Sequence, residues 1–377
     1  MKAKILLLAA LFLFGAAVPS YALPIDTAAT HAILVDVDTG TVLLNKNADV
    51  HMPTSSMSKT MTLYLVFDAL KQGQLKLSDE FTVSEKAWRM EGSKMFIKVG
   101  SKVKVEDLIR GVAIQSGNDA AVTLAEGLAG SETDFAGRMN ERAKELGMSN
   151  SHFMNASGWP VPDHYSTPRD LALLARHIIV DYPEYYRYFG EKDFTYNKIH
   201  QPNRDPLLGK VDGADGIKTG HTDIAGYGLI GSAKRNGRRL ILVINGLQSE
   251  KARAEEGARL MEWGFRNFEN KTLVKKGDQV EVAKVWLGQE TDVPLIADKD
   301  LTVVLPAGRK SDVKMTVNYK APIEAPIKQG AVVGKLHIVI PDQDPVDVNL
   351  VAGKDVERAG LFTRVAARFR YLVWGTI

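Results

Sequence analysis

Two hydrophobic periodicities alternate along the chain up to about residue 268. Apolar residues at every second position predict strands, and apolar residues three or four positions apart predict helices. Residues 32–44 predict a β-hairpin with its turn at Asp38-Thr39-Gly40. The other predicted elements are strands at 225–233 and 239–246 and helices at 58–70, 105–114, 120–129, 132–146 and 255–268. Because strands come from both ends of this region and helices from between them, we expect an α+β domain.

The helical pattern ends after residue 268. Residues 280–282, 313–317 and 336–340 alternate with a period of two, and turn residues at 306–308 and 341–342 separate them. The pattern predicts a small all-β domain, a sandwich, that continues to about Gly353. No residues of catalytic type stand out in it, so we expect the chemistry to lie in the first domain.

The N-terminal residues indicate export. Lys2 and Lys4 precede an apolar run at 5–18, and Ser20-Tyr21-Ala22 has the small-residue spacing that signal peptidase recognises. We therefore predict a signal peptide that is cleaved after Ala22. The alternative is a membrane-spanning anchor, but such a helix needs about 20 apolar residues, more than this run provides.

The C-terminal residues 357–377 contain no proline and predict an amphipathic helix. Arg364, Arg368 and Arg370 lie at the edges of its apolar side or opposite to it, and Tyr371 and Trp374 lie near its end. A basic amphipathic helix with aromatic residues typically lies in the membrane interface. The alternative is a last helix that packs on the protein's own core. The apolar side consists of Leu361, Phe362, Val365, Ala366, Phe369, Leu372 and Val373.

Composition narrows the classes of function. The net charge of +3 falls to +1 once Lys2 and Lys4 are removed, which gives no reason to expect nucleic acid as a partner. The chain has no cysteine, so disulfides, thiolate metal sites and a cysteine nucleophile are excluded. Its eight histidines lack the spacing of metal ligands, and no glycine-rich phosphate loop is present. We therefore expect neither a metal nor an organic cofactor.

Three short motifs follow one another in the first domain. They are Ser56-Met57-Ser58-Lys59 (S-x-x-K), Ser116-Gly117-Asn118 (S-x-N) and Lys218-Thr219-Gly220 (K-T-G). The first is weak evidence alone, because S-x-x-K recurs at 101–104 and 311–314. A K-T-G is expected by chance only about 0.1 times in a chain of this length. The ordered triple is therefore the strong signal.

The residue types in these motifs suit nucleophilic catalysis. Ser56 and Lys59 are three positions apart at a predicted helix start, so their side chains share one face. A serine hydroxyl needs a base within hydrogen-bond reach, and lysine can serve if its pKa falls. Lys218 would lower the pKa of Lys59 as a second nearby cation. Ser116 can relay a proton to a leaving nitrogen, and Asn118 can hold a substrate amide.

Each motif also has a purely structural alternative. Ser56 could be the N-cap of a helix that follows Pro53, and Ser116 could cap the next one. Thr219-Gly220 could form an ordinary turn.

The residues around the motifs resemble a known family. The three motifs are shared by penicillin-binding proteins and serine β-lactamases. The segments PTSSMSKTMT at 53–62, SGNDA at 116–120 and DGIKTGHT at 215–222 are similar to those of type-5 low-molecular-mass D-alanyl-D-alanine carboxypeptidases. The resemblance extends over nearly the whole chain, from the signal peptide to the amphipathic tail.

The resemblance implies a role for each residue. Ser56 would be acylated, Lys59 would be the base, and Ser116 would relay the proton. The backbone N–H groups of Ser56 and His221 would form the oxyanion hole, and Thr219 and Arg253 would bind the terminal carboxylate. The implied substrate-binding residues are Asn118, Lys218, Thr219, Gly220, His221 and Arg253.

One departure concerns the β-lactamases. Class A enzymes have S-D-N where this chain has S-G-N, and they use a deacylating glutamate that has no evident counterpart here. The nearest carboxylates in 155–170 are Asp163 and Asp170, and Asp170 belongs to the helix start Thr167-Pro168. Efficient β-lactamase activity is therefore not expected.

These observations define the expected protein. It has a signal peptide (1–22), a penicillin-binding domain of the serine β-lactamase-like α+β fold (23–268), an all-β domain (269–353) and a membrane-anchoring helix (354–377). Its implied activity is removal of the terminal D-alanine from peptidoglycan pentapeptides at the periplasmic face of the inner membrane, with β-lactams as covalent inhibitors. The alternatives are a transpeptidase, a β-lactamase or a catalytically silent scaffold that binds the cell wall.

Overall fold

The computed structural model describes residues 25–308, 313–340 and 344–374. The predicted signal peptide and the last three residues of the predicted tail lie outside this part. Contacts divide the described chain into two units. The first unit consists of residues 25–276 and 299–308. The second unit consists of residues 277–298, 313–340 and 344–374. The limits at 268 and 353 that the sequence suggested stay a prediction.

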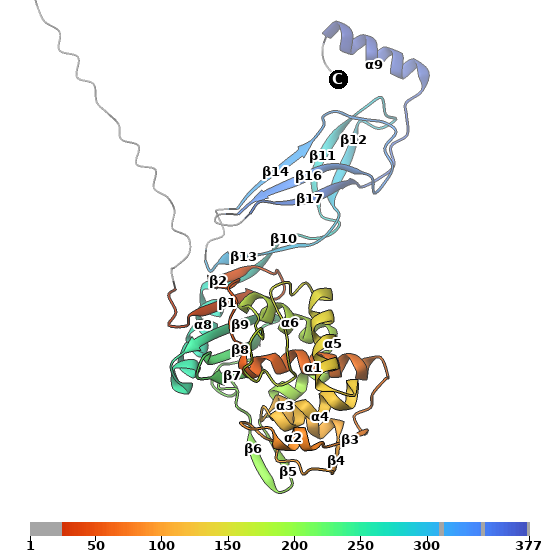
Figure 1. Cartoon of the computed structure of the whole chain (residues 1–377). Helices are drawn as coiled ribbons and strands as arrows, with labels where there is room; N and C mark the ends of the chain where they lie inside the picture. The colour runs from red at the N-terminus through yellow and green to blue at the C-terminus, as the bar shows by residue number, and fades with distance from the viewer. Residues whose placement is uncertain (1–24, 309–312, 341–343, 375–377) are drawn as a thin grey trace, which may run out of the picture. The chain divides into compact units, whose positions relative to one another are not determined.

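A five-stranded antiparallel sheet forms the centre of the first unit (Figure 1). Strands from both ends of the unit meet in it, in the order β2-β1-β9-β8-β7. Leu34 of β1 lies opposite Leu44 of β2, which confirms the predicted hairpin. The strands are β1 (His31–Asp36), β2 (Val42–Lys46), β7 (Ala214–Thr222), β8 (Gly226–Arg235) and β9 (Arg238–Leu247).

Helices cover both faces of this sheet. Helix α8 (Glu250–Asn267) covers one face, where its Met261 is buried in the same cluster as Leu242 of β9. Val243, the next residue of β9, belongs to the larger cluster of the other face. Successive side chains of a strand point to opposite faces, so both faces are buried. The first unit is thus an α+β domain, as predicted.

The helices on the other face lie between β2 and β7 in the sequence. Thr167 caps one of them by accepting a hydrogen bond from the backbone N–H of Asp170 at 3.1 Å, as its sequence predicts. These helices are α1 (Lys59–Lys71), α2 (Glu85–Arg89), α3 (Val105–Ala113), α4 (Asn118–Ala129), α5 (Glu132–Glu145), α6 (Pro168–Asp181) and α7 (Pro183–Tyr186), with short 3₁₀ turns η1 (Ser55–Ser58) and η2 (Arg187–Gly190). Three pairs of antiparallel strands complete the unit, formed by β3 (Glu80–Thr82) with β4 (Lys102–Lys104), β5 (Asp193–Tyr196) with β6 (Ile199–Pro202), and β10 (Phe268–Val274) with β13 (Leu301–Pro306).

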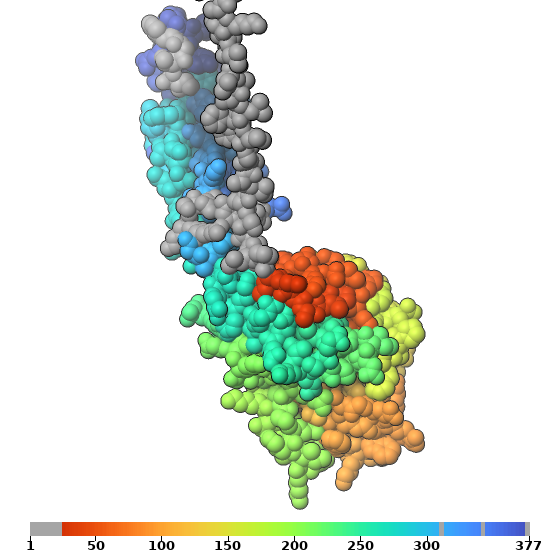
Figure 2. All heavy atoms as spheres, turned by 90° about the vertical axis from the view of Figure 1, so that its left-hand side faces the viewer, coloured from red at the N-terminus to blue at the C-terminus, as the bar shows by residue number. Residues whose placement is uncertain are grey.

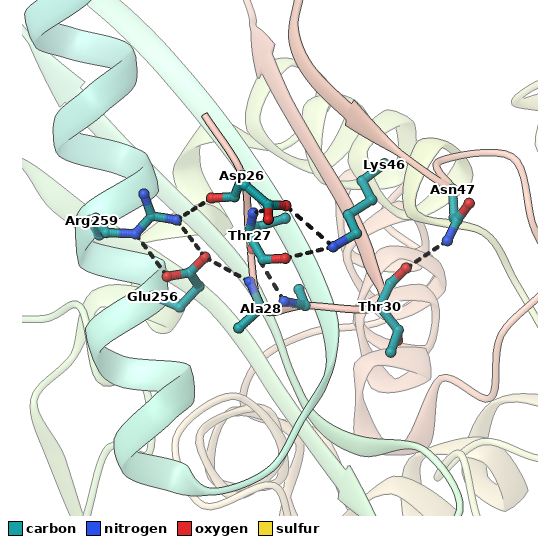
Figure 3. A network of polar contacts seen from close by, with 9 residues as sticks. Asp26, Thr27, Ala28, Thr30, Lys46, Asn47, Glu256 and Arg259 are labelled. Carbon is teal, nitrogen blue, oxygen red and sulfur yellow. Dashed lines mark hydrogen bonds and ion pairs between the residues drawn. The ribbon is translucent and has the colours of Figure 1, made fainter. Parts of the chain in front are cut away.

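The first described residues are held against α8 by polar contacts (Figure 3). Glu256 accepts a hydrogen bond from the backbone N–H of Ala28, and Arg259 donates to the backbone carbonyl of Asp26. Lys46 of β2 lies 3.6 Å from the Asp26 carboxylate. In the space-filling view, the N-terminal residues in red accordingly lie beside the teal residues around α8 (Figure 2). The chain therefore enters the domain on the side away from the helices between β2 and β7.

The second unit is all-β with one terminal helix. Its sheet has the order β14-β16-β17-β12-β11-β15, in which only β11 and β15 pair in parallel among the described strands. The predicted all-β C-terminal domain is thus confirmed. The strands are β11 (Gln279–Trp286), β12 (Asp292–Ala297), β14 (Lys314–Tyr319), β15 (Ile323–Glu324), β16 (Val332–Val339) and β17 (Val346–Ala352), and helix α9 (Leu361–Trp374) follows them.

Candidate active site

The three motifs converge on one cleft of about 670 Å³ in the first unit. Ser56 belongs to η1 just before α1, Asn118 is the first residue of α4, and Thr219 lies in the edge strand β7. Lys59 and Lys218 are buried beside the cleft, bonded to residues of its wall. The other predicted site residues all line the cleft, namely Ser56, Ser116, Asn118, Thr219, Gly220, His221 and Arg253.

The structural alternatives for the motifs do not apply. No side-chain cap is present at the start of η1, α1 or α4, so neither Ser56 nor Ser116 acts as an N-cap. Thr219 and Gly220 lie inside β7, paired with Leu229 and Gly228 of β8, and not in a turn.

Gly220 allows β7 to approach the turn that carries Ser56. A Cβ atom at this position would lie 2.9 Å from the carbonyl oxygen of Thr54 and 3.2 Å from Cβ of Ser55. A side chain would therefore push the strand away from η1. The glycine of the K-T-G motif is explained by this close backbone contact.

Lys59 connects the first two motifs. Its Nζ lies 2.8 Å from Oγ of Ser56, 2.6 Å from Oδ1 of Asn118 and 2.6 Å from the carbonyl oxygen of Ser157. The side chain is fully buried. Asn118 also donates from Nδ2 to the carbonyl of Glu91 at 2.6 Å. Both ends of Asn118 are thus engaged within the protein, whereas its sequence suggested contact with a substrate amide.

Burial lowers the pKa of Lys59 to about 7, with a further contribution from the positive charge of Arg204. The sequence had pointed to Lys218 as the neighbouring cation. The pKa of Lys218 is itself held well below its usual range by burial and by the charge of Lys59. Arg204 is thus the neighbouring cation that adds to the effect of burial on the pKa of Lys59. Lys59 can be neutral near neutral pH.

Ser116 has an unusual backbone and an unpaired hydroxyl. Its φ of 66° lies in the left-handed region, which is costly for a non-glycine residue. The side chain is 2% exposed, and its Oγ makes no hydrogen bond with the described residues. Buried hydroxyls usually have a partner. A strained residue with a free hydroxyl in a cleft is typical of a group that acts on a bound molecule.

One end of the cleft carries two arginines, with the carboxylate of Glu250 3.8 Å from Arg253. Arg253 of α8 is 6% exposed, and its Nε makes no hydrogen bond with the described residues. Its guanidinium lies 5.6 Å from the ring of Tyr227, which stacks on His221 at 3.9 Å. Arg204 donates to Oγ of Ser93 at 2.6 Å on the same cleft wall. This end is suited to bind a carboxylate.

Sequence reasoning missed Arg204, Ser157 and Tyr227. None of the three belongs to a motif, and each comes from a segment distant from Ser56 in the chain. Only proximity in the fold reveals them. Among the described residues, no group of three or more histidine or acidic side chains could hold a metal ion.

Comparisons with known proteins agree with this geometry. Residues 17–249 match the family described as D-alanyl-D-alanine carboxypeptidase, and residues 268–358 match the penicillin-binding protein 5 C-terminal domain. The chain is 41% identical over 341 residues to D-alanyl-D-alanine carboxypeptidase DacC of Escherichia coli, covering 88% of this chain and 85% of that protein. It is 39% identical to DacA of Haemophilus influenzae, covering 91% and 88%.

Solved structures are similar as well. Penicillin-binding protein 5 from Haemophilus influenzae superposes with a TM-score of 0.78 at 38% identity, covering 89% of this chain and 99% of that one. Penicillin-binding protein D2 from Listeria monocytogenes, solved in an ampicillin-bound form, superposes with a TM-score of 0.60 at 35% identity, covering 64% and 99%.

Proposed function

This chain belongs to the D-alanyl-D-alanine carboxypeptidase family, and from that premise we propose that it is a serine hydrolase that removes the terminal D-alanine from peptidoglycan pentapeptides. The observation that carries the proposal is the 2.8 Å contact between Nζ of Lys59 and Oγ of Ser56, made by a buried lysine with a pKa of about 7. A neutral amine at this distance can activate the serine.

In the acylation step, Lys59 takes the proton of Ser56 as Oγ attacks the carbonyl carbon of the penultimate D-alanine. The backbone N–H groups of Ser56 and His221 stabilise the oxyanion. Ser116 then passes its hydroxyl proton to the amide nitrogen and takes up the proton held by Lys59, so that the carbon–nitrogen bond breaks, D-alanine leaves and Lys59 is neutral again. The free hydroxyl of Ser116 supports this relay. Water hydrolyses the resulting ester and regenerates Ser56.

The charged end of the cleft orients the substrate. The terminal carboxylate binds to Thr219 and Arg253, and its charge is compatible with Arg204 nearby. The rest of the peptide lies along β7, because an edge strand has unpaired backbone groups that can pair with an extended chain. A catalytically silent scaffold would need neither the buried Lys59 nor the strained Ser116.

Release of D-alanine tests this function. The purified protein, incubated with a peptide that ends in D-Ala–D-Ala, is expected to release one free D-alanine per peptide, and prior incubation with penicillin is expected to stop the release. D-alanine is quantified enzymatically, and the products are identified by mass spectrometry. Formation of cross-linked peptide in place of free acid would make the protein a transpeptidase.

We also propose that α9 lies in the interface of the membrane and holds the exported enzyme at its periplasmic face. Along α9, Phe362 is 90% exposed and Leu372 is 85% exposed, as expected for side chains that a lipid surface would cover. Among the described helices, none has the length and hydropathy needed to cross a membrane. Peripheral attachment fits such a helix.

Removal of this helix is expected to release the protein from membranes. A chain that stops at Lys354 should be found in the soluble fraction and keep its activity, because the cleft lies in the other unit. Phe369→Glu with Leu372→Glu should release the full-length protein too, since two charges oppose insertion of the apolar side. Membrane fractionation measures the effect, with Val282→Glu, an exposed valine of β11, as the control. A truncated protein that still sediments with membranes would contradict the anchor.

A further inference from the structure

A buried carboxyl group lies behind the end of the cleft that carries the two arginines. Asp205 follows Arg204 directly in the chain, but it is only 6% exposed and does not line the cleft. Its Oδ1 accepts a hydrogen bond from the backbone N–H of Leu207 at 2.9 Å. Its Oδ2 is buried and makes no hydrogen bond with the described residues. The catalytic steps do not use this carboxyl group, so its burial needs another explanation.

Leu207 brings Asp205 close to helix α8. A Cβ atom on Gly257 of α8 would lie 3.2 Å from Cδ2 of Leu207, so the helix and the segment that carries Asp205 are in close contact. Arg253 lies four positions before Gly257, and residues four positions apart share one face of a helix. Arg253 therefore points from α8 toward the segment of Asp205, one turn along the helix from the contact with Leu207.

The two side chains carry opposite charges that act on each other. Burial raises the pKa of Asp205 to about 6, and the N–H of Leu207 and the charges of Arg253 and Lys218 oppose this effect. At neutral pH the carboxyl group is therefore mostly ionised. Burial also lowers the pKa of Arg253, and nearby carboxylates, with Asp205 among them, counteract it. Each charge thus compensates for part of the burial of the other.

One buried atom of each side chain has no partner. Nε of Arg253 is a donor and Oδ2 of Asp205 is an acceptor, and neither makes a hydrogen bond with the described residues. Buried polar atoms in this state are uncommon and destabilising. Nη2 of Arg253 lies 3.8 Å from Glu250, which lines the cleft. The Nη2 side of the guanidinium therefore faces the cleft, and Nε lies on the buried side.

We propose that Asp205 is a positioning residue for Arg253. When the terminal carboxylate of the substrate binds to the Nη atoms of Arg253, Oδ2 of Asp205 accepts the hydrogen of Nε, which fixes the plane of the guanidinium. A guanidinium has donors along more than one edge, so one carboxylate can hold it from behind while another binds in front. The proposal rests on the carboxypeptidase function and adds to the site a residue that does not line the cleft.

Asp205→Asn tests this role, because asparagine keeps the size of the side chain and an oxygen for the N–H of Leu207 but removes the charge. We expect kcat/KM for a peptide that ends in D-Ala–D-Ala to fall about tenfold, the effect of weakening one hydrogen bond to a charged group. The change should be in KM, with kcat nearly unchanged, because Arg253 binds the substrate and does not react with it. Release of D-alanine is measured at about pH 8, where Asp205 is ionised and Lys59 is neutral.

Arg253→Gln shows whether Asp205 acts through the arginine. When Asp205→Asn is added to Arg253→Gln, kcat/KM should fall further by less than about twofold, because no guanidinium is left to position. Asp212→Asn is the matched control. Asp212 also lies beside an arginine, 3.7 Å from Arg235, but its side chain is 90% exposed and outside the cleft. It should leave kcat/KM unchanged.

Two results would overturn the role of Asp205 while the carboxypeptidase function stands. One is a wild-type kcat/KM in the Asp205→Asn protein. The other is an equal loss with and without Arg253, which is the result expected of a residue that only supports the fold. If thermal unfolding shows that Asp205→Asn is not folded, Asp205→Ser takes its place, since a serine hydroxyl can also accept the N–H two residues further on. A wild-type protein that releases no D-alanine would instead refute the proposed function.

Discussion

Lys59→Met is expected to lower kcat/KM for a D-Ala–D-Ala peptide by about 10²–10⁴-fold, the contribution typical of a general base. The same variant should react with a tagged penicillin more slowly by a similar factor, because acylation of Ser56 begins with the same proton transfer. Ser56→Ala should show no covalent labelling at all. Both effects are measured by D-alanine release and by fluorescence of the labelled band on a denaturing gel.

Lys71→Met provides the control for this substitution. Lys71 ends the same helix α1, and its Nζ donates to the carbonyl of Asp181 on the surface. Because Lys59→Met leaves Oδ1 of Asn118 and the carbonyl of Ser157 without their buried donor, thermal unfolding must show that the variant is still folded at the assay temperature. A folded Lys59→Met protein with more than a tenth of wild-type activity would exclude Lys59 as the base.

The pH dependence follows from the same group. Lys59 accepts a proton only when neutral, so kcat/KM should fall about tenfold per pH unit below its pKa of about 7. Arg204→Gln removes a positive charge that lowers this pKa, so the acid limb should move to higher pH. Arg187→Gln, a surface arginine of η2 with contacts to Glu106 and Glu191, should leave the limb in place. An unmoved limb in Arg204→Gln would exclude Arg204 as the tuning charge.

The acyl-enzyme formed with penicillin is expected to last about 10²–10⁴ times longer than the one formed with peptide, which corresponds to the loss of general-base assistance. When a peptide reacts, D-alanine departs and leaves room for water near Lys59 and Ser116. When a penicillin reacts, the leaving nitrogen stays attached to the opened ring and occupies that space. Class A β-lactamases avoid this obstruction with a separate glutamate.

The surroundings of Ser56 support this expectation. The carboxyl group of Asp170 is 4% exposed and accepts hydrogen bonds from the backbone of Asn150 and from Ser151. Asp163 does not line the cleft, and the acidic residues that do, Asp223 and Glu250, make no hydrogen bond or ion pair with Ser56 or Lys59 in the part of the chain that is described. A base for water on the second face of the ester is thus not evident among these residues.

Mass spectrometry of the intact protein measures both lifetimes. The penicilloyl adduct should persist long after the peptidyl adduct has turned over, and Asp163→Asn should not prolong it. A penicilloyl adduct that clears as fast as the peptide is hydrolysed would make β-lactamase the better description.

The sequence by itself determined the motifs and part of the elements, because both depend on residues that are close in the chain. The hairpin of β1 and β2 follows from alternating apolar residues around Asp38-Thr39-Gly40, and the N-cap at Thr167 follows from local hydrogen bonding. The contact between Ser56 and Lys59 also follows from local sequence, because residues three positions apart in a helical turn have their side chains on the same face. The amphipathic pattern of α9 is local in the same way.

Only the tertiary structure decided the electrostatics and the walls of the site. The pKa of Lys59 depends on burial and on Arg204, and its third hydrogen bond goes to the carbonyl of Ser157. Neither neighbour belongs to a motif, and desolvation depends on everything that packs around a group. The unpaired hydroxyl of Ser116 has the same origin, because the absence of a partner depends on all segments that surround it.

The walls of the cleft and the pairing of distant strands were likewise decided by contacts between segments that are far apart in the chain. Trp159 and Ile224 look like ordinary loop residues in the sequence, and they line the same cleft only because β7 and the segment after Ser157 meet at η1. Strands β10 and β13 pair within the first unit although β11 and β12 of the other unit lie between them in the sequence. Pairing between distant strands carries no periodic signal of its own, because a strand's apolar pattern indicates which face it buries and not which strand lies beside it.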